Sequence, residues 1–188
     1  MAIFGKNSTL LQKIFGSFLI IDIVLCFIAM FTEILVDNSV IQFMFWLGCF
    51  LSVVIIVLVL KSLSNQDSQI RKNIDAQGQS IAFTAVAVII GIPMLTVFAF
   101  SKGVPTVLHM ATSQQGEMIV TVSKKPFSYS RKRCQGGVNL KNYTYFMNDE
   151  VCGLKRTHWG TVRPGDRIRL TGEKSMFGFS TEKYKILK

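Results

Sequence analysis

Histidine and cysteine, the residue types that most often carry metal or nucleophilic chemistry, are few and scattered in this chain of 188 residues. His109 and His158 are its two histidines. Cys134, Cys152 and His158 could together offer ligands to zinc, but the C-x-x-C and H-x-x-x-H spacings of zinc sites do not occur. A G-x-S-x-G nucleophile element and a glycine-rich phosphate loop are also missing from the sequence. The sequence therefore predicts a protein that is not an enzyme and has no metal or cofactor.

Asp22 is a carboxylate within a long apolar stretch, about 12 Å from its start at 1.5 Å per helical residue. A charged group at that depth in a membrane is costly and is a candidate for function. At helical spacing, Asp22, Cys26 and Glu33 fall on one narrow polar stripe. The stripe either packs on neighbouring helices, with Asp22 bonded to Thr84 or Ser52, or lines an ion or proton path. Packing is favoured, because the other two apolar stretches hold no ionisable residue.

Cys134 and Cys152 form a possible disulfide pair in the polar tail. Such a bridge persists only in an oxidising compartment. It would close a loop of about 19 residues and stabilise a small domain by roughly 3 kcal/mol. The alternative is a pair of unrelated, reduced thiols.

Three apolar stretches position the intramembrane residues: 14–35, 40–60 and 81–100. Each reaches the roughly 20 residues that a helix needs to cross a bilayer. A soluble bundle would require polar faces, which these stretches lack. The sequence thus predicts three transmembrane helices, the first two joined as a tight hairpin.

Charges beside these stretches predict the orientation. Cations precede the first span and follow the second, whereas the short first loop carries Asp37 and no cation. The positive-inside rule then places residues 1–13 and the loop 61–80 in the cytoplasm. Beyond a linker at 101–115, the C-terminal domain is expected outside a bacterial inner membrane. The cations used in this argument are Lys6, Lys13, Lys61, Arg71 and Lys72.

The tail carries the charge of the chain. Residues 102–188 hold 16 Lys and Arg against 6 Asp and Glu, which accounts for the whole net charge of +10. The densest cations form two basic stretches that could attract anionic lipid or, if the tail is cytoplasmic, nucleic acid. A solvated, soluble face is the simpler explanation. The two stretches are Lys124, Lys125, Arg131, Lys132 and Arg133.

From residue 116 onward the apolar pattern alternates, as in strands with one buried face. Expected strands lie near 118–123, 138–147, 151–154, 167–171 and 176–187, with residues 159–162 leading into a turn at 163–166. The segment 162–172, Val-Arg-Pro-Gly-Asp-Arg-Ile-Arg-Leu-Thr-Gly, resembles the strand-turn-strand element of OB-like and SH3-like barrels. That resemblance implies a fold and no function. The expected fold class is membrane α + β, with three transmembrane helices followed by a small all-β barrel at 116–188.

The leading functional hypothesis is a non-enzymatic membrane protein whose basic domain binds a partner at the membrane surface. An accessory subunit of an envelope complex and an immunity or phage-exclusion protein are two forms of it. One alternative is a small channel or transporter subunit that uses Asp22. Another is a cytoplasmic tail that binds RNA or a nucleocapsid, a layout similar to that of the three-span matrix proteins of enveloped RNA viruses, without a shared motif.

Overall fold

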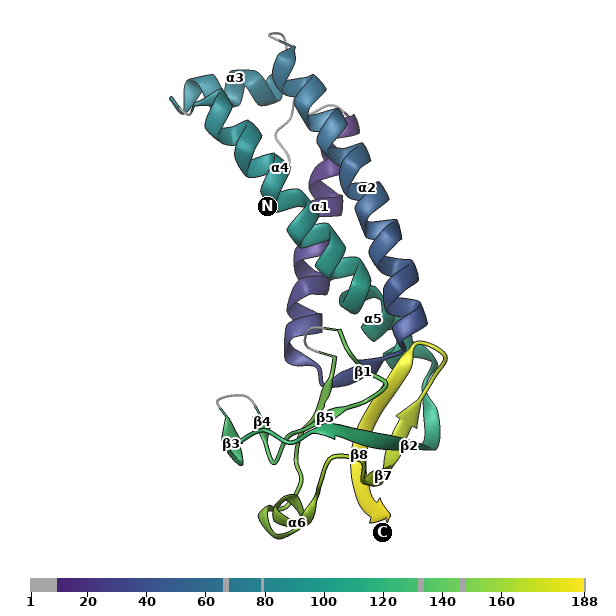
Figure 1. The fold of residues 1–188 in the computed structure, drawn as a ribbon. Coiled ribbons are helices and arrows are strands. Elements are labelled where there is room, and N and C mark those ends of the chain that lie inside the picture. Colours follow the sequence, from purple (N-terminus) through teal and green to yellow (C-terminus); the bar gives the residue numbers. More distant parts are fainter. Residues whose placement is uncertain (1–9, 66–67, 79, 132–133, 146–147, 188) are drawn as a thin grey trace. The chain divides into compact units, whose positions relative to one another are not determined.

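A computed structural model describes residues 10–65, 68–78, 80–131, 134–145 and 148–187. The chain divides into two compact units (Figure 1). The helical unit comprises the chain up to Met30 together with Gln42–Val104, and the β-domain comprises Phe31–Ile41 together with Pro105–Lys188. The chain therefore passes between the two units three times.

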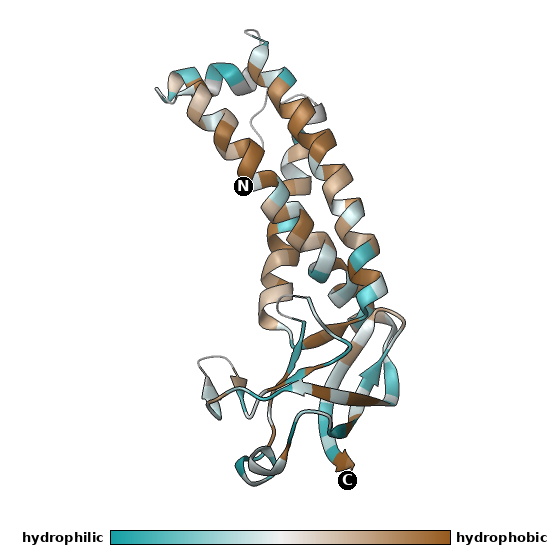
Figure 2. Ribbon diagram, viewed as in Figure 1, coloured by the Kyte–Doolittle hydropathy of each residue, from teal (hydrophilic) through white to brown (hydrophobic). Residues whose placement is uncertain are grey.

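Three helices of the structure have the length and composition of membrane spans: Lys13–Phe31, Asn38–Ser64 and Ile81–Thr112. Figure 2 shows their predominantly brown, apolar colouring and the polar helix α3. The prediction of three long apolar helices is confirmed, and their length and composition suggest contact with a lipid bilayer. The described helices here are α1 (Leu10–Phe31), α2 (Asn38–Ser64), α3 (Gln69–Ala76), α4 (Ile81–Phe98) and the π turn η1 (Ala99–Gly103).

The third helix extends further than its apolar composition predicts. Helical backbone continues through η1 and α5 (Val104–Thr112), where the sequence pattern predicts a linker at 101–115. Gly103 in η1 permits close packing, because a Cβ atom there would lie 2.7 Å from the carbonyl oxygen of Leu25 on α1. Lys102 and His109 are buried in this continuation. Lys102, Gly103 and Pro105 interrupt the apolar pattern, so the sequence predicted a linker in place of a continuing helix.

The first helix, in contrast, ends earlier than predicted. It stops at Phe31 instead of residue 35, and Ile34–Val36 form strand β1. All three residues of β1 are buried, as expected for a run of branched side chains. The predicted tight hairpin between the first two spans therefore contains a strand of the β-domain.

The β-domain contains a curled, six-stranded antiparallel sheet in the order β1-β8-β7-β2-β5-β6. The long strands β2 (Gln114–Lys124), β7 (Arg167–Lys174) and β8 (Gly178–Leu187) form its centre, and β5 (Val138–Leu140) and β6 (Glu150–Val151) lie on one side. Strands β3 (Ser130–Arg131) and β4 (Cys134–Gln135) pair separately. Residues 156–161 form a helix, α6 (Arg156–Thr161), where the sequence suggests an extended approach to the turn. The domain is thus not purely β.

Side chains that alternate along the strands make one core. In β7, Ile168 and Leu170 are buried while Arg167 and Arg169 face outward, which is the period-two pattern expected from the sequence. The buried members of the core are Leu35, Val120, Val122, Val138, Leu140, Val151, Leu154, Val162, Ile168, Leu170 and Phe179.

The two edge strands are connected by one side chain. Asn148, 2% exposed, accepts a hydrogen bond from the Val36 N–H at 2.7 Å and donates one to the Val36 carbonyl at 2.7 Å. Val36 belongs to β1 at one edge of the sheet, and Asn148 lies just before β6 at the other. The Asn148 amide therefore pairs with the backbone of β1 as a neighbouring strand would, and it connects the β1 edge of the sheet to the segment before β6.

Candidate functional site: the open seam of the β-domain

Strand β8 has one edge that is only partly occupied. β7 pairs with it along nearly its whole length, whereas β1 pairs only with Gly178–Ser180. In the described part of the chain, no strand pairs with the second edge of residues 181–187. We call this gap, between β8 and the segment that follows β6, the seam.

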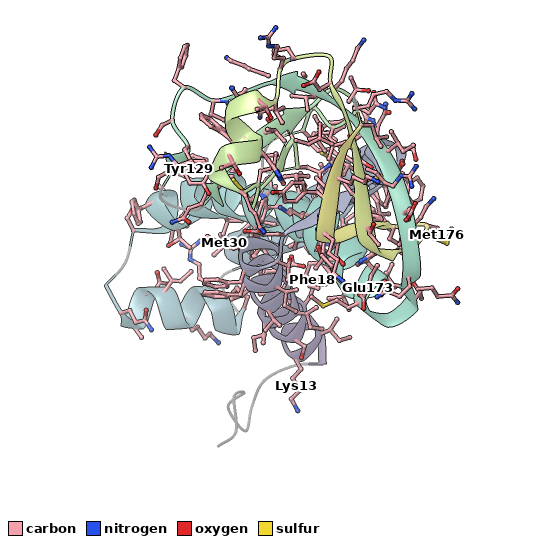
Figure 3. All side chains as sticks on the ribbon, turned by 90° about the horizontal axis from the view of Figure 1, so that it is seen from below. Lys13, Phe18, Met30, Tyr129, Glu173 and Met176 are labelled. Carbon is pink, nitrogen blue, oxygen red and sulfur yellow. A yellow bond between two sulfur atoms is a disulfide. The ribbon has the colours of Figure 1, made fainter. Side chains whose placement is uncertain are left out.

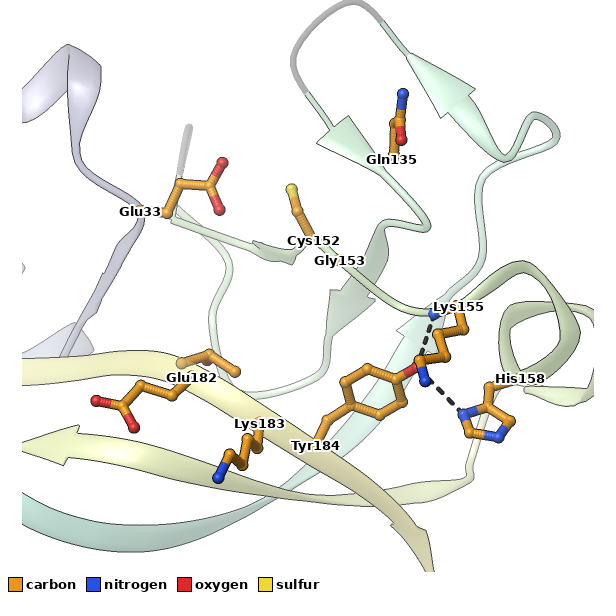
Figure 4. A pocket seen from close by; sticks show the side chains of 10 residues that line it. Glu33, Gln135, Cys152, Gly153, Lys155, His158, Glu182, Lys183 and Tyr184 are labelled. Carbon is orange, nitrogen blue, oxygen red and sulfur yellow. Dashed lines mark hydrogen bonds between the residues drawn. The ribbon is translucent and has the colours of Figure 1, made fainter.

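A pocket of about 730 Å³ lies along the seam (Figure 4). Its volume falls in the range of ordinary ligand sites, roughly 300–1,000 Å³. Charged and polar groups from both walls line it, so the pocket is not an apolar cofactor cavity. The lining residues are Glu33, Gln135, Cys152, Gly153, Lys155, His158, Thr181, Glu182, Lys183 and Tyr184.

Tyr184 connects the two walls of the seam. Its hydroxyl accepts a hydrogen bond from the Lys155 backbone N–H at 2.6 Å and lies 3.1 Å from Nδ1 of His158 (Figure 4). The His158 and Tyr184 rings also meet edge to face, with centroids 5.8 Å apart. This network positions the end of β8 against the start of α6. The network thus joins residues from both walls by hydrogen bonds.

The outer face beside the seam is strongly basic. Arg169 lies directly opposite Lys185 in the β7–β8 ladder, and Arg167 and Lys183 lie one pair away on the same face. Like charges directly opposite each other destabilise a sheet. Glu117 compensates in part, with its carboxylate 3.5 Å from Nη1 of Arg169, but no ion pair to Lys185 is found among the described residues. Figure 3 shows charged side-chain ends projecting around the strands.

The basic stretches named from the sequence are not gathered into one patch by the described residues. Lys124 is exposed at the end of β2, while the Lys125 ammonium lies 4.7 Å from the Trp159 ring centroid and contacts the Trp159 carbonyl at 3.3 Å. Tyr129 meets Trp159 edge to face. Lys125, which follows β2, therefore connects this strand to Trp159 of α6. Arg131 lies in β3, and its side chain, with Lys132 and Arg133, lies outside the described residues.

The predicted bridge between Cys134 and Cys152 is present, with Cα atoms 5.3 Å apart. Cys152 also lines the pocket, so the disulfide ties β4 to one wall of the seam. The turn beside it requires glycine: Gly136 has φ +63°, and its backbone N–H donates to the Tyr129 carbonyl at 2.8 Å. The disulfide thus fixes the segment that faces β8.

Asp22 is fully buried in the helical unit and is hydrogen-bonded at 2.8 Å to the hydroxyl of Thr96 on α4. Sequence reasoning named Thr84 and Ser52 as partners, but their hydroxyls donate to the carbonyls of Ser80 and Cys49 instead. Thr96 was missed because spacing within one helix does not reveal which turn of another helix lies opposite.

Glu33 does not share an intramembrane stripe with Asp22. It follows the end of α1 at Phe31, belongs to the β-domain and lines the seam pocket. The predicted stripe required the helix to continue to residue 35, whereas α1 ends at Phe31 and strand β1 begins at Ile34.

Two buried polar residues of the β-domain carry no sequence signal. His109 is 1% exposed and lies 2.8 Å from the Ser175 hydroxyl through Nδ1. Asn148 holds β1, as described above. Both contacts join positions far apart in the chain, so no local motif marks them.

Comparison with protein-family models, with curated proteins and with solved structures finds no match to this chain. The chemistry of the site therefore has to be argued from the residues themselves.

Proposed function

We propose that this protein is a non-enzymatic membrane protein that presents its basic β-domain to an acidic partner at the membrane surface. The observation that carries the proposal is the opposed pair Arg169 and Lys185, with Arg167 and Lys183 beside it. A cluster of this kind costs stability in the free domain and is relieved when an anionic surface covers it. An accessory role in an envelope complex, or an immunity or phage-exclusion role, fits this chemistry.

We further propose that the β-domain lies outside the cytoplasm of a bacterial cell. The Cys134–Cys152 disulfide supports this side, because such bonds persist in oxidising compartments. The cations Lys61, Arg71 and Lys72 after the second span support it independently. Paired reporters fused after residue 188, one active outside and one active inside, test the side directly. A signal from the inner reporter alone would contradict the proposal and make RNA the first partner to test.

Partner binding is tested by photo-crosslinking in native membranes. A photoreactive residue at Arg167 should trap one defined protein, and trapping should fall several-fold when Arg169 and Lys185 are both changed to Glu, because the outer-face charge reverses. The double variant Lys141→Glu with Arg163→Glu changes the net charge equally at exposed positions elsewhere in the domain and is the matched control. Random neighbours, or equal loss in both double variants, would count against the proposal.

A channel or transporter subunit remains the second candidate, favoured by Asp22. Its Oδ2 is bonded to Thr96, while Oδ1 is buried without a hydrogen-bond partner among the described residues. Ion or proton flux into vesicles should then fall on Asp22→Asn, with Cys49→Ser as the control. Unchanged flux, or none with either protein, would remove this candidate.

A further inference from the structure

We infer that the free edge of β8 receives an extended segment of the protein partner as an added β-strand, with acidic side chains at alternate positions. The inference rests on the proposed function and names the place and the form of the interaction. It concerns residues 181–187 and the seam pocket beside them.

The first argument is the incomplete ladder. A free strand edge presents backbone N–H and C=O groups that pair most fully with another strand. β1 already occupies this edge at Gly178–Ser180, so the backbone of β8 accepts a strand on that side. β1 cannot continue toward residues 181–187, because the preceding residues turn into α1, which ends at Phe31. Among the described residues this length of edge has no strand beside it, and we assign it to a segment of the partner.

The second argument is the space beside the edge. The pocket of about 730 Å³ runs between residues 181–184 of β8 and the opposite wall at Cys152–Lys155 (Figure 4). The disulfide and the bond from Lys155 to Tyr184 hold that wall in place. The Tyr184 side chain spans between the β8 backbone and this wall, so the wall stays one side chain away from the edge and the gap persists in the free domain.

The third argument is charge. Side chains of an added strand would alternate between the pocket and the outer face. The side chains of the added strand on the outer face would lie next to Lys183 and Lys185. These two lysines are paired with Thr171 and Arg169 of β7. Edge lysines commonly protect a sheet against unwanted pairing. They reject apolar strands and accept Asp or Glu, so the same residues provide selectivity.

Binding of a defined peptide to the full chain in nanodiscs tests the inference. The probe is a fluorescent eight-residue peptide with Glu at every second position and Val or Thr between. Anisotropy should show saturable binding. The same peptide with Lys in place of Glu should bind at least about tenfold more weakly, because it meets the outer-face lysines with like charge. Absence of saturable binding by the Glu peptide would overturn the inference.

Two N-methylated peptides distinguish strand addition from attraction between side chains. One carries N-methyl groups on the odd amides and the other on the even amides. In an antiparallel pair, every second residue directs both backbone groups to the neighbouring strand. One methylated peptide should therefore lose binding at least tenfold while the other retains it. Equal binding by both would show that only charge is recognised and would overturn strand addition.

Variants of the chain separate this inference from the proposed function. Lys183→Glu with Lys185→Glu should weaken binding of the Glu peptide at least tenfold, whereas Lys141→Glu with Arg163→Glu should change it less than twofold. If photo-crosslinking from Arg167 traps a defined partner but the peptides behave alike, strand addition fails and partner binding stands. If no defined partner is trapped, the proposed function fails, whatever the peptide does.

Discussion

The two units of this protein place apolar and polar side chains in opposite ways. In the helical unit, large apolar side chains cover the surface: Trp46 is 66% exposed, Phe83 74% and Met94 72%, while Asp22 and Thr96 are buried completely. In the β-domain, Phe179 and Leu170 are buried and the cations lie outside. One chain therefore folds against two solvents, lipid and water.

This difference in exposed side chains determines which unit presents polar groups to a partner. In lipid, Asp22 and Thr96 are buried and hydrogen-bonded to each other, and the apolar surface offers few polar groups to a partner. In water, the exposed cations and the free edge of β8 offer charge and backbone groups to the solvent. Each of the following changes tests whether the two units differ in this way.

The largest difference in stability between the two units is expected when a phenylalanine in each is changed to alanine. Phe179→Ala should destabilise the β-domain by about 3–5 kcal/mol, because Phe179 is 1% exposed in a packed core. Phe83→Ala should cost far less, because its side chain faces outward on α4. Hydrogen exchange of the β7 and β8 amides, in the full chain in nanodiscs, measures the first effect. Equal costs would contradict the assignment of lipid to the helical surface.

A charged substitution at an exposed apolar position should instead cost more in the helical unit than in the β-domain. Ile90 on α4 is 57% exposed, and Ile119 on β2 is 44% exposed. Ile90→Asp should cost about 3 kcal/mol in membrane insertion, because a carboxylate enters hydrocarbon. Ile119→Asp should cost less than about 0.5 kcal/mol, the usual limit for surface changes in water. Insertion is measured by glycosylation mapping of the span, and stability of the second variant by hydrogen exchange.

Reduction should affect only the β-domain. Changing Cys134 and Cys152 to Ser should lower its free energy of unfolding by about 3 kcal/mol, since the unfolded chain loses a loop constraint. Cys49→Ser in α2 is the control and should leave redox sensitivity unchanged. Segment-resolved hydrogen exchange with and without reductant measures both. Loss of protection in the helices on reduction would contradict the separation.

The smallest effect is expected at high pH. Burial, and secondarily the carboxylate of Asp37, raise the pKa of Tyr143 above its ordinary value of 10.0. The folded β-domain thus holds the phenol proton more tightly than the unfolded chain does. Its contribution to stability is complete below pH 10 and declines as pH rises through the folded pKa. Tyr143→Phe should flatten this decline, as seen in denaturant titrations of the full chain between pH 8 and 11.

Patterns of apolar residues along the sequence predicted the long helices and the strands in which buried and exposed residues alternate. The apolar stretches predicted three long helices, the alternation at 118–123 and 167–171 predicted β2 and β7, and the cysteines predicted their bond. The turn before β7 also follows its sequence, with Gly165 at φ +94° and Asp166 accepting from the Arg163 N–H at 2.8 Å. Short elements were harder, because β1 and α6 hold too few residues to show a period.

The candidate site could be predicted only in part. Cys152 was named from the sequence, and Glu33 was named for a membrane stripe that the structure does not contain. Tyr184, His158 and Lys155 come together only through strand order and the packing of α6. Thr96 was missed for the same reason, since its bond to Asp22 spans 74 residues of sequence.

The amino-acid sequence by itself determined the two solvents of this protein, because hydropathy and charge are summed along the chain and need no partner. It also determined the strands with a regular alternation. Tertiary structure alone decided that Ile34–Val36 pair with β8 and that this pairing stops at Ser180. Such pairings depend on which edges meet in space and in which register, and hydrogen bonds between distant backbone groups leave no local mark. The free edge of β8 is the consequence, and it is where a partner is expected.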